Sequence, residues 1–338
     1  MLDLKNKSIL ITGGTGSFGK RFVKEILTQY PNISRLVIFS RDEYKQHLMK
    51  QEFSPNQHSV LKYILGNIRD LDRLKQVFKN IDYIIHAAAL KQVDTSEENP
   101  TEFIKTNILG TENIIEAAQF CNVQKVIALS SDKAVNPASL YGATKMCADK
   151  LFVAANFHPY PSETKFSIVR YGNVIGSRGS VIPLFLKKKR EKVLPVTDPQ
   201  MTRFHVPLGT ESNAILFALQ HAQGGEIIVP KLLSFCLKDV IQVICPTCKQ
   251  ENIGLRIGEK KHEELISQEE SLNTYNLKNY YLIVPRHKEF KLDYYTQLDS
   301  SLNKVLVNFN YSSNQSQHYL SFSELQEEIS RYIASIQE

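Results

Sequence analysis

The sequence is poor in cysteine and has no long apolar run, and both absences limit what the protein can be. Its 338 residues include five cysteines. Their irregular spacing does not form the disulfide framework of a small secreted domain, so a reducing compartment is expected. No apolar segment approaches the ~20 residues that span a bilayer, and MLDLKNKSIL at the N-terminus does not resemble a signal peptide. We therefore expect a cytoplasmic protein without a membrane segment.

Metal-site spacing and clustered basic charge are also lacking. Cys245 and Cys248 form a CPTC motif, but no second pair follows at zinc-site spacing, so a structural or incidental pair is predicted and no metal. The formal net charge is +6, and the densest basic run, residues 187–190, has no interleaved aromatic residues. This run favours a solvated helix face, with steering of an anionic ligand as the alternative, and no nucleic-acid partner is predicted.

What the sequence does contain is a regular alternation of strands and helical segments. Residues 8–12 form an apolar strand, GGTGSFG follows at once, and an amphipathic segment covers 20–29. Further apolar strands are predicted at 35–39, 61–65, 82–86 and 126–129, with a long helix over 100–120. The alternation predicts an α/β protein with a Rossmann-type, doubly wound parallel sheet, whose ligands bind beyond the carboxyl ends of the strands.

The glycine turn after the first strand predicts a dinucleotide site. Glycines let the backbone approach a pyrophosphate, and the helix N-terminus directs N–H groups at the negative charge. Ser40 and Arg41 follow the second strand, where a hydroxyl and a guanidinium suit the 2′-phosphate of NADP; Asp42, one residue further on, keeps NAD as the alternative. The predicted cofactor-binding residues are Gly13, Thr15, Gly16, Ser17, Phe18, Gly19, Ser40, Arg41, Asn67, Ile68, Ala87, Ala88, Ala89, Tyr141, Lys145 and Val174.

Two sets of proton-handling side chains follow the strand at 126–129. Tyr141 and Lys145 are four residues apart and so share a helix face, where the ammonium should lower the pKa of the phenol and make it a base for a substrate hydroxyl. Asp132 and Lys133 lie just upstream and form a second acid/base pair, a loop ion pair being the plain structural alternative. Together the two sets indicate more than one proton transfer per turnover.

The clean alternation fades after Val174, which suggests a different organisation. We predict a dinucleotide-binding domain over 1–174 that carries the catalytic residues and to which some later segments return. A smaller mixed α/β cap over 175–290 would bind substrate, and a tail over 291–338 would end in a helix over 322–336. Residues 287–318 are polar and are predicted to form loops. Arg178, Arg203 and Arg256 suggest a diphosphate ligand, although single arginines more often form surface ion pairs.

Motifs along nearly the whole chain resemble those of the extended short-chain dehydrogenase/reductase superfamily, and more closely its inverting UDP-N-acetylglucosamine 4,6-dehydratases. They are TGGTGSFG, FSRDE, AAALK, IKTNILGT, LSSDKAVNP, YGATK, VRYGNVIGSRGS, MTRF, GGEIIVPK and RIGEKKHEEL. The Asp-Lys pair joined to YxxxK is the most specific of them. The chain departs from the family pattern at Asn67, Gln92, Asp94 and Ile257, and Gln92 and Asp94 bear on the choice of sugar.

The resemblance implies a mechanism in which NADP accepts and later returns a hydride while water is lost. Tyr141, assisted by Lys145 and Ser131, would take the proton of the C-4 hydroxyl. Lys133, desolvated enough to be partly neutral, would remove the C-5 proton, and Asp132, if protonated, would protonate the leaving C-6 hydroxyl. The resemblance also implies a homo-oligomer, with a hexamer suspected. The predicted substrate-binding residues are Lys91, Asn173, Arg178, Arg203, Arg256 and Glu259.

Two other functions compete with this one. A nucleotide-sugar C-4 epimerase would need Tyr141, Lys145 and a tightly held nicotinamide, but it has no use for Asp132 and Lys133. A regulator that binds NADP without chemistry is the alternative from another class, and such proteins typically lose the tyrosine or the lysine that this chain keeps.

Overall fold

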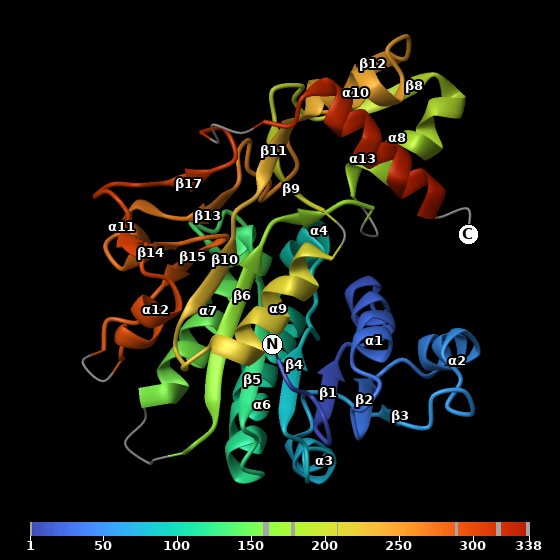
Figure 1. The fold of residues 1–338 in the computed structure, drawn as a ribbon. Coiled ribbons are helices and arrows are strands. Elements are labelled where there is room, and N and C mark those ends of the chain that lie inside the picture. Colours follow the sequence, from blue (N-terminus) through green and yellow to red (C-terminus); the bar gives the residue numbers. More distant parts are fainter. Residues whose placement is uncertain are drawn as a thin grey trace.

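A ten-stranded sheet forms the centre of the computed structural model, which describes residues 2–157, 162–176, 180–207, 209–287, 290–315 and 319–335 (Figure 1). The strand order is β16-β14-β15-β10-β6-β5-β4-β1-β2-β3. The strands are β1 (Ser8–Thr12), β2 (Arg35–Ser40), β3 (Leu61–Leu65), β4 (Tyr83–His86), β5 (Lys125–Ser131), β6 (Lys165–Tyr171), β10 (Ile227–Pro230), β14 (Thr274–Leu277), β15 (Tyr280–Ile283) and β16 (Asn303–Lys304).

Within this sheet, the neighbouring strands β3, β2, β1, β4, β5, β6 and β10 run parallel to one another. β15, β14 and β16 then continue the sheet, each antiparallel to its neighbour. The order reverses between β1 and β4, so the loops after these strands separate and leave room for a ligand. The predicted α/β class and the parallel Rossmann-type sheet are confirmed. Because β10, β14, β15 and β16 belong to this sheet, segments far beyond Val174 return to it.

Helices cover both faces of the sheet because the buried strand residues alternate in direction. Leu10 packs into a core with α3, α6 and α7, whereas Ile9 and Ile11 pack into a second core with α1, α2 and α9. The helices are α1 (Ser17–Gln29), α2 (Glu43–Glu52), α3 (Leu71–Val77), α6 (Gly110–Phe120), α7 (Leu140–Ala154) and α9 (Thr210–His221). Both sides of the sheet are thus occupied by apolar side chains, and the cavity described below lies beyond the strand ends.

The predicted helix over 100–120 exists, but it has an irregular centre. It consists of α5 (Pro100–Phe103), a π-helical segment (Ile104–Leu109) and α6, and α4 (Val93–Glu98) precedes it. π-helical turns frequently mark functional positions, because the extra residue redirects a side chain. Here the segment carries Asn107, which is buried.

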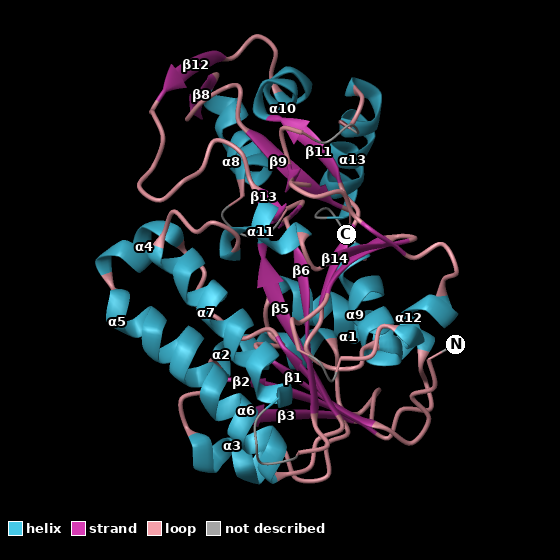
Figure 2. Ribbon diagram, turned by 90° about the vertical axis from the view of Figure 1, so that its left-hand side faces the viewer, coloured by secondary structure: helices cyan, strands magenta, loops and turns pink. Residues whose placement is uncertain are grey.

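A smaller group of elements stands at the carboxyl ends of the parallel strands (Figures 1 and 2). It contains the sheet β7 (Asn173–Val174), β9 (Thr202–Val206) and β11 (Leu233–Cys236), the parallel pair β8 (Val193–Val196) and β12 (Lys249–Asn252), and the helices α8 (Val181–Lys188), α10 (Leu237–Ile244) and α13 (Phe322–Ser335). We call this group the cap. It has its own apolar core, in which Leu325 of α13 is fully buried.

The prediction of loops over 287–318 was wrong in part. The structure places α12 (Asp293–Leu298), β16 and β17 (Tyr311–Ser312) in this stretch, after α11 (Gln268–Ser271). β17 pairs with β13 (Glu264–Ile266). Tertiary contacts supply what the polar sequence does not reveal, since Tyr311 is buried and its hydroxyl donates to the carbonyl of Leu232 at 2.8 Å.

The CPTC motif lies in the cap, where a disulfide joins Cys245 and Cys248. No cluster of three or more His, Cys, Asp or Glu side chains suited to a metal ion occurs within the described part of the chain. Among the described residues, no helix has both the length and the apolar character needed to cross a bilayer.

Candidate active site

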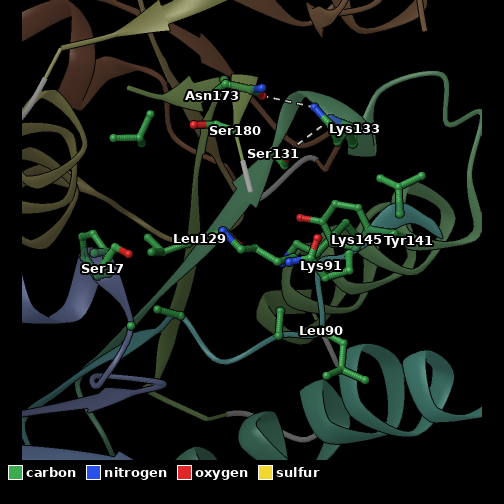
Figure 3. Close-up of a pocket in the computed structure, with 18 of the residues that line it drawn as sticks. Ser17, Leu90, Lys91, Leu129, Ser131, Lys133, Tyr141, Lys145, Asn173 and Ser180 are labelled. Atoms are coloured by element: carbon green, nitrogen blue, oxygen red, sulfur yellow. Dashed lines mark hydrogen bonds between the residues drawn. The ribbon is translucent and has the colours of Figure 1, made fainter. Parts of the chain in front are cut away.

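A cavity of about 830 Å³ lies at the carboxyl ends of the parallel strands, with cap elements on its other side (Figure 3). It brings together every predicted cofactor-binding residue. It is also lined by Ser131, Lys133, Lys91, Asn173, Arg203, Arg256 and Glu259. Two predicted residues are not in this lining: Asp132 is buried behind it, and Arg178 lies outside the described residues.

The glycine turn shapes one end of the cavity. Gly13 has a φ of +66°, which favours glycine, and a Cβ there would lie 2.8 Å from the Cα of Ala88. The hydroxyl of Thr12 accepts the N–H groups of Ala87 and Ala88, each at 3.2 Å. These bonds fix the backbone after β4, which forms the cavity wall opposite the glycine turn. The turn leads directly into α1, whose N-cap is Gly16. A bare backbone wall facing a helix N-terminus fits the pyrophosphate of a dinucleotide.

The end of β2 presents a hydroxyl and a guanidinium. Ser40 is buried and its Oγ accepts the amide of Gln46 at 3.0 Å, while Arg41 is exposed and lines the cavity. Asp42 also lines the cavity, but it caps α2: its carboxylate accepts the N–H of Lys45 at 2.9 Å and pairs with the ammonium of the same residue at 3.0 Å. The carboxylate that could have recognised a ribose hydroxyl is therefore engaged by Lys45.

Tyr141 and Lys145 both face the cavity from α7, as predicted from their spacing. Lys145 donates to the carbonyl of Leu129 at 2.8 Å, and burial lowers its pKa. Burial also raises the pKa of Tyr141 to about 12, against a lowering influence from Lys133. This differs from the sequence expectation, in which Lys145 lowers the pKa of the tyrosine.

Asn107 holds the loop after β4 against α7. Its Oδ1 accepts the N–H of Leu90 at 2.9 Å, and its Nδ2 donates to the carbonyl of Leu90 at 2.9 Å and to the hydroxyl of Thr144 at 3.0 Å. These bonds connect the two walls that carry Ala88 and Tyr141. The sequence analysis assigned no role to this asparagine, and the π-helical geometry that directs it is not visible in the sequence.

Lys133 is surrounded by acceptors. Its ammonium donates to Asp132 at 3.1 Å and to Asn173 at 3.2 Å, and it lies 3.1 Å from Oε1 of Glu263 (Figure 3 shows the bond to Asn173). Burial works to lower its pKa, but Asp132 and Glu263 outweigh this and raise it. The prediction of a partly neutral lysine therefore does not describe this arrangement, in which the two carboxylates keep Lys133 charged.

Asp132 is fully buried beside this ammonium. Its Oδ1 accepts the hydroxyl of Ser131 at 2.7 Å as well as Lys133, and its Oδ2 has no hydrogen-bond partner among the described residues. The carboxylate thus reaches the cavity only through Ser131 and Lys133, both of which line it.

The predicted substrate arginines differ in their surroundings. Arg203 of β9 is largely buried and donates to the carbonyls of Thr202, Lys260 and Lys261 at 2.8 to 3.1 Å. It therefore holds the 259–263 segment in place. Arg256 is more than half exposed and pairs with Glu259 at 3.3 Å, so its guanidinium remains accessible at the rim.

Glu263 is the main residue that the sequence analysis missed. It belongs to the quoted RIGEKKHEEL motif, but nothing local distinguishes it from the neighbouring carboxylates. In the structure its side chain is 2% exposed, lines the cavity, and lies near Lys133, Arg203 and Lys260.

Comparison with known proteins places this geometry in a family. Residues 9–285 match the family model described as polysaccharide biosynthesis protein. Two Campylobacter jejuni relatives are named UDP-N-acetylglucosamine 4,6-dehydratase (inverting). That of strain 81-176 is 44% identical over 94% of this chain and 96% of its own length. That of strain NCTC 11168 is 45% identical over 95% and 96%. The chain belongs to this dehydratase family.

Other matches place the dehydratase family within a broader fold. A protein of Rickettsia bellii named UDP-glucose 4-epimerase is 41% identical over 82% of this chain and 83% of its own. The solved structure of Pen from Bacillus thuringiensis shares 36% identity and a TM-score of 0.88 over 98% of this chain and 99% of that one. A dTDP-glucose 4,6-dehydratase of Streptomyces venezuelae, solved with NAD and TYD bound, shares the fold at a TM-score of 0.69 and 20% identity, each chain covered to 98%.

Proposed function

We propose that the protein is an NADP-dependent UDP-N-acetylglucosamine 4,6-dehydratase that inverts C-5 and serves the synthesis of surface or flagellar glycan sugars. The product would be UDP-2-acetamido-2,6-dideoxy-β-L-arabino-hex-4-ulose. One observation carries the proposal: a single cavity holds the Tyr141–Lys145 pair, the Asp132–Lys133 pair and a glycine turn fitted to a dinucleotide. The family membership supports the same substrate.

The cofactor would lie along the glycine turn with its adenine end toward Asn67 and Ile68. Gly13, Gly16 and the first turn of α1 would hold the pyrophosphate. Arg41, exposed at the end of β2, would bind a 2′-phosphate, and the engagement of Asp42 by Lys45 favours NADP over NAD. Tyr141 and Lys145 would lie beside the nicotinamide ribose.

The sugar nucleotide would occupy the part of the cavity between residues 131–133, which follow β5, and the cap. We propose that Arg256 binds the diphosphate at the rim and that Arg203 contributes chiefly by holding the 259–263 segment. Asn173 would orient both the substrate and Lys133, to which it is already bonded. Lys91 and Glu259 complete the proposed set of contacts.

The proposed mechanism removes the proton of the C-4 hydroxyl first and the C-5 proton second, because oxidation at C-4 makes the C-5 proton acidic. A nicotinamide bound beside Tyr141 and Lys145 would supply the hydride acceptor for C-4 and the hydride donor for C-6, and its positive charge would favour the phenolate of Tyr141. Tyr141 removes the proton of the C-4 hydroxyl. The resulting ketone acidifies the C-5 proton, and Lys133 is the base placed to remove it once its own proton has left. Asp132, which is hydrogen-bonded to Lys133, would accept the proton that Lys133 gives up and would pass it through Ser131 to the departing C-6 hydroxyl.

The proton balance closes within the site. The enzyme takes one proton from the C-4 hydroxyl and one from C-5, and it returns one to the leaving water and one to C-5. Ser131 donates to Asp132, and Asp132 accepts from Lys133, so these three groups form a continuous hydrogen-bonded path on one side of the cavity. No external reductant is consumed.

The test is to incubate the protein with UDP-N-acetylglucosamine and NADP in deuterated water and to analyse the product by NMR. A 4-keto-6-deoxy sugar with deuterium at C-5 supports the proposal, and a parallel reaction in ordinary water gives the C-5 configuration. A 4-epimer without exchange at C-5 would show an epimerase. Unchanged substrate would point to a regulator that binds the cofactor without chemistry.

The epimerase is the second candidate because relatives that carry the name UDP-glucose 4-epimerase match most of the chain. Oxidation at C-4 is common to both reactions and would use Tyr141 with Lys145 and Ser131. A buried Asp132–Lys133 pair beside the same cavity has no task in epimerisation, so the site favours dehydration. The homo-oligomeric state and the cytoplasmic location stay predictions.

A further inference from the structure

The carboxylate of Glu263 completes the surroundings of Lys133. Its Oε1 lies 3.1 Å from the Lys133 ammonium, at the same distance as Oδ1 of Asp132. Asn173 accepts the third contact at 3.2 Å. An ammonium has three N–H donors, so these acceptors can use all of them and fix the nitrogen at one place in the cavity wall.

The backbone of Glu263 is held from a distant part of the chain. Its N–H donates to the hydroxyl of Ser313 at 2.9 Å, and its carbonyl accepts the N–H of Ser313 at 2.8 Å. The Ser313 hydroxyl lies 2.7 Å from that of Thr202 in β9. These buried hydrogen bonds fix the backbone that carries the carboxylate. A surface ion pair has no such support, because both of its side chains are mobile.

We propose that Glu263 is a positioning residue that fixes both the place and the charge of the Lys133 amine, and so sets the acidity range in which the amine can handle the C-5 proton. The proposal rests on the proposed function, which gives Lys133 that proton.

The charges around the pair support this role. Lys133 faces two carboxylates, Asp132 and Glu263, against one nearby cation, Arg203, and Tyr141 lies beside it. Burial works to raise the pKa of Glu263, but Lys133, Arg203 and Lys260 lower it to about 2. Glu263 is therefore ionised throughout the neutral range, and it favours the charged form of Lys133 continuously.

The experiment compares the rate of product formation across pH for the wild type, Glu263→Gln and Glu264→Gln. Glu264 is the matched control, because it is adjacent in sequence but its carboxylate accepts the side chain of Asn136 at 2.6 Å. Removing the charge of Glu263 should lower the pH of the acid limb by about 1 to 3 pH units. Loss of position should lower the plateau rate by up to roughly 100-fold.

The expected signature is a rate ratio that changes with pH. Glu263→Gln should fall furthest below the wild type at high pH and approach it at low pH, whereas Glu264→Gln should follow the wild type throughout. A Glu263→Gln rate equal to the wild-type rate, or reduced by one constant factor at all pH values, would overturn the proposal. Glu263→Asp keeps the charge on a shorter arm, so it should lower the plateau without moving the acid limb. It carries the test if the glutamine variant fails to fold.

A second measurement does not depend on the reaction. Competitive acetylation of lysines at a series of pH values, read by mass spectrometry, reports how readily Lys133 loses its proton. Lys133 should become reactive at lower pH in Glu263→Gln than in the wild type, while Lys150 on the exposed face of α7 stays unchanged. If the wild type yields no 4-keto-6-deoxy sugar but Lys133 still shifts, the proposed function fails and the electrostatic role of Glu263 stands. If Lys133 does not shift, the inference itself is wrong.

Discussion

The chain up to Val174 and the chain after it contribute to the cavity in different ways. In the first part, the cavity residues directly follow parallel strands: Gly13 follows β1, Arg41 follows β2 and Lys133 follows β5. Their positions are a consequence of the sheet. In the second part, Glu263 follows no strand of this sheet, and its backbone is hydrogen-bonded to Ser313, whose hydroxyl contacts Thr202 of β9. The first part carries the proposed catalytic residues, including Asp132 and Lys133, and the second part adds the carboxylate of Glu263 beside Lys133.

The largest expected effect comes from breaking the first part at its centre. Lys133→Ala should lower dehydration by about 10³-fold or more, since a positioned acid–base group contributes about 10² to 10⁴. Bound NADP should be retained, because the glycine turn is untouched. Product formation and cofactor content are measured together, with Lys150→Ala as a surface control. Full activity in Lys133→Ala would show that Lys133 is not the base that removes the C-5 proton.

The next prediction concerns the charge contact between the two parts. The folded pKa of Glu263 is lowered from its ordinary 4.5 to about 2 by Lys133, Arg203 and Lys260, against burial. A lowered carboxylate pKa contributes stability above the ordinary value and loses it as pH falls through the folded one. The unfolding free energy of the wild type minus that of Glu263→Gln should therefore be about 2 to 3 kcal/mol larger at pH 6 than at pH 2. Denaturant unfolding at several pH values measures this, and a difference independent of pH would contradict it.

A smaller effect is expected from loosening the second part without touching a charge. Ser313→Ala would remove the hydroxyl that accepts the N–H of Glu263, whereas the hydroxyl of Thr202 would keep its contact with Nδ1 of His262 at 2.8 Å. This should cost about 1 to 3 kcal/mol in unfolding free energy. Activity should fall as Glu263 moves from Lys133. Ser323→Ala, exposed on α13, is the control, and unchanged stability and rate in Ser313→Ala would show that Glu263 needs no such support.

The smallest effect should be confined to the nucleotide end of the first part. Arg41→Ala should weaken NADP binding by roughly tenfold, the equivalent of one charge-assisted hydrogen bond. The affinity for NAD should hardly change. Titration calorimetry with both cofactors, and with Arg190→Ala as an exposed control, checks this. Equal losses for NADP and NAD would mean that Arg41 does not recognise a 2′-phosphate.

The same contrast explains what could be predicted from the sequence. The α/β class, the glycine turn and the shared face of Tyr141 and Lys145 follow from local patterns that the sheet then brings together. The pKa directions of Tyr141 and Lys133 could not be predicted, because they depend on burial and on charges from remote segments. Glu263 resembles its neighbours in the sequence and differs from them only by its burial and its contacts.

Prediction failed for similar reasons in the 287–318 stretch. Its polar composition suggested loops, yet Tyr311 is buried against Leu232 and Ser313 is fully buried. Short strands such as β17 have too few residues to show a periodic pattern, and their pairing partners decide whether they form.

The hold of Ser313 on Glu263 also has a consequence for how the protein is made. Synthesis proceeds from the N-terminus, and early segments can fold while later ones are still in the ribosome. The glycine turn and Lys133 emerge first, whereas the two backbone hydrogen bonds of Glu263 to Ser313 can form only after residue 313 has followed. In a nascent chain, the glycine turn and the strands beside it can therefore fold before Glu263 is fixed next to Lys133.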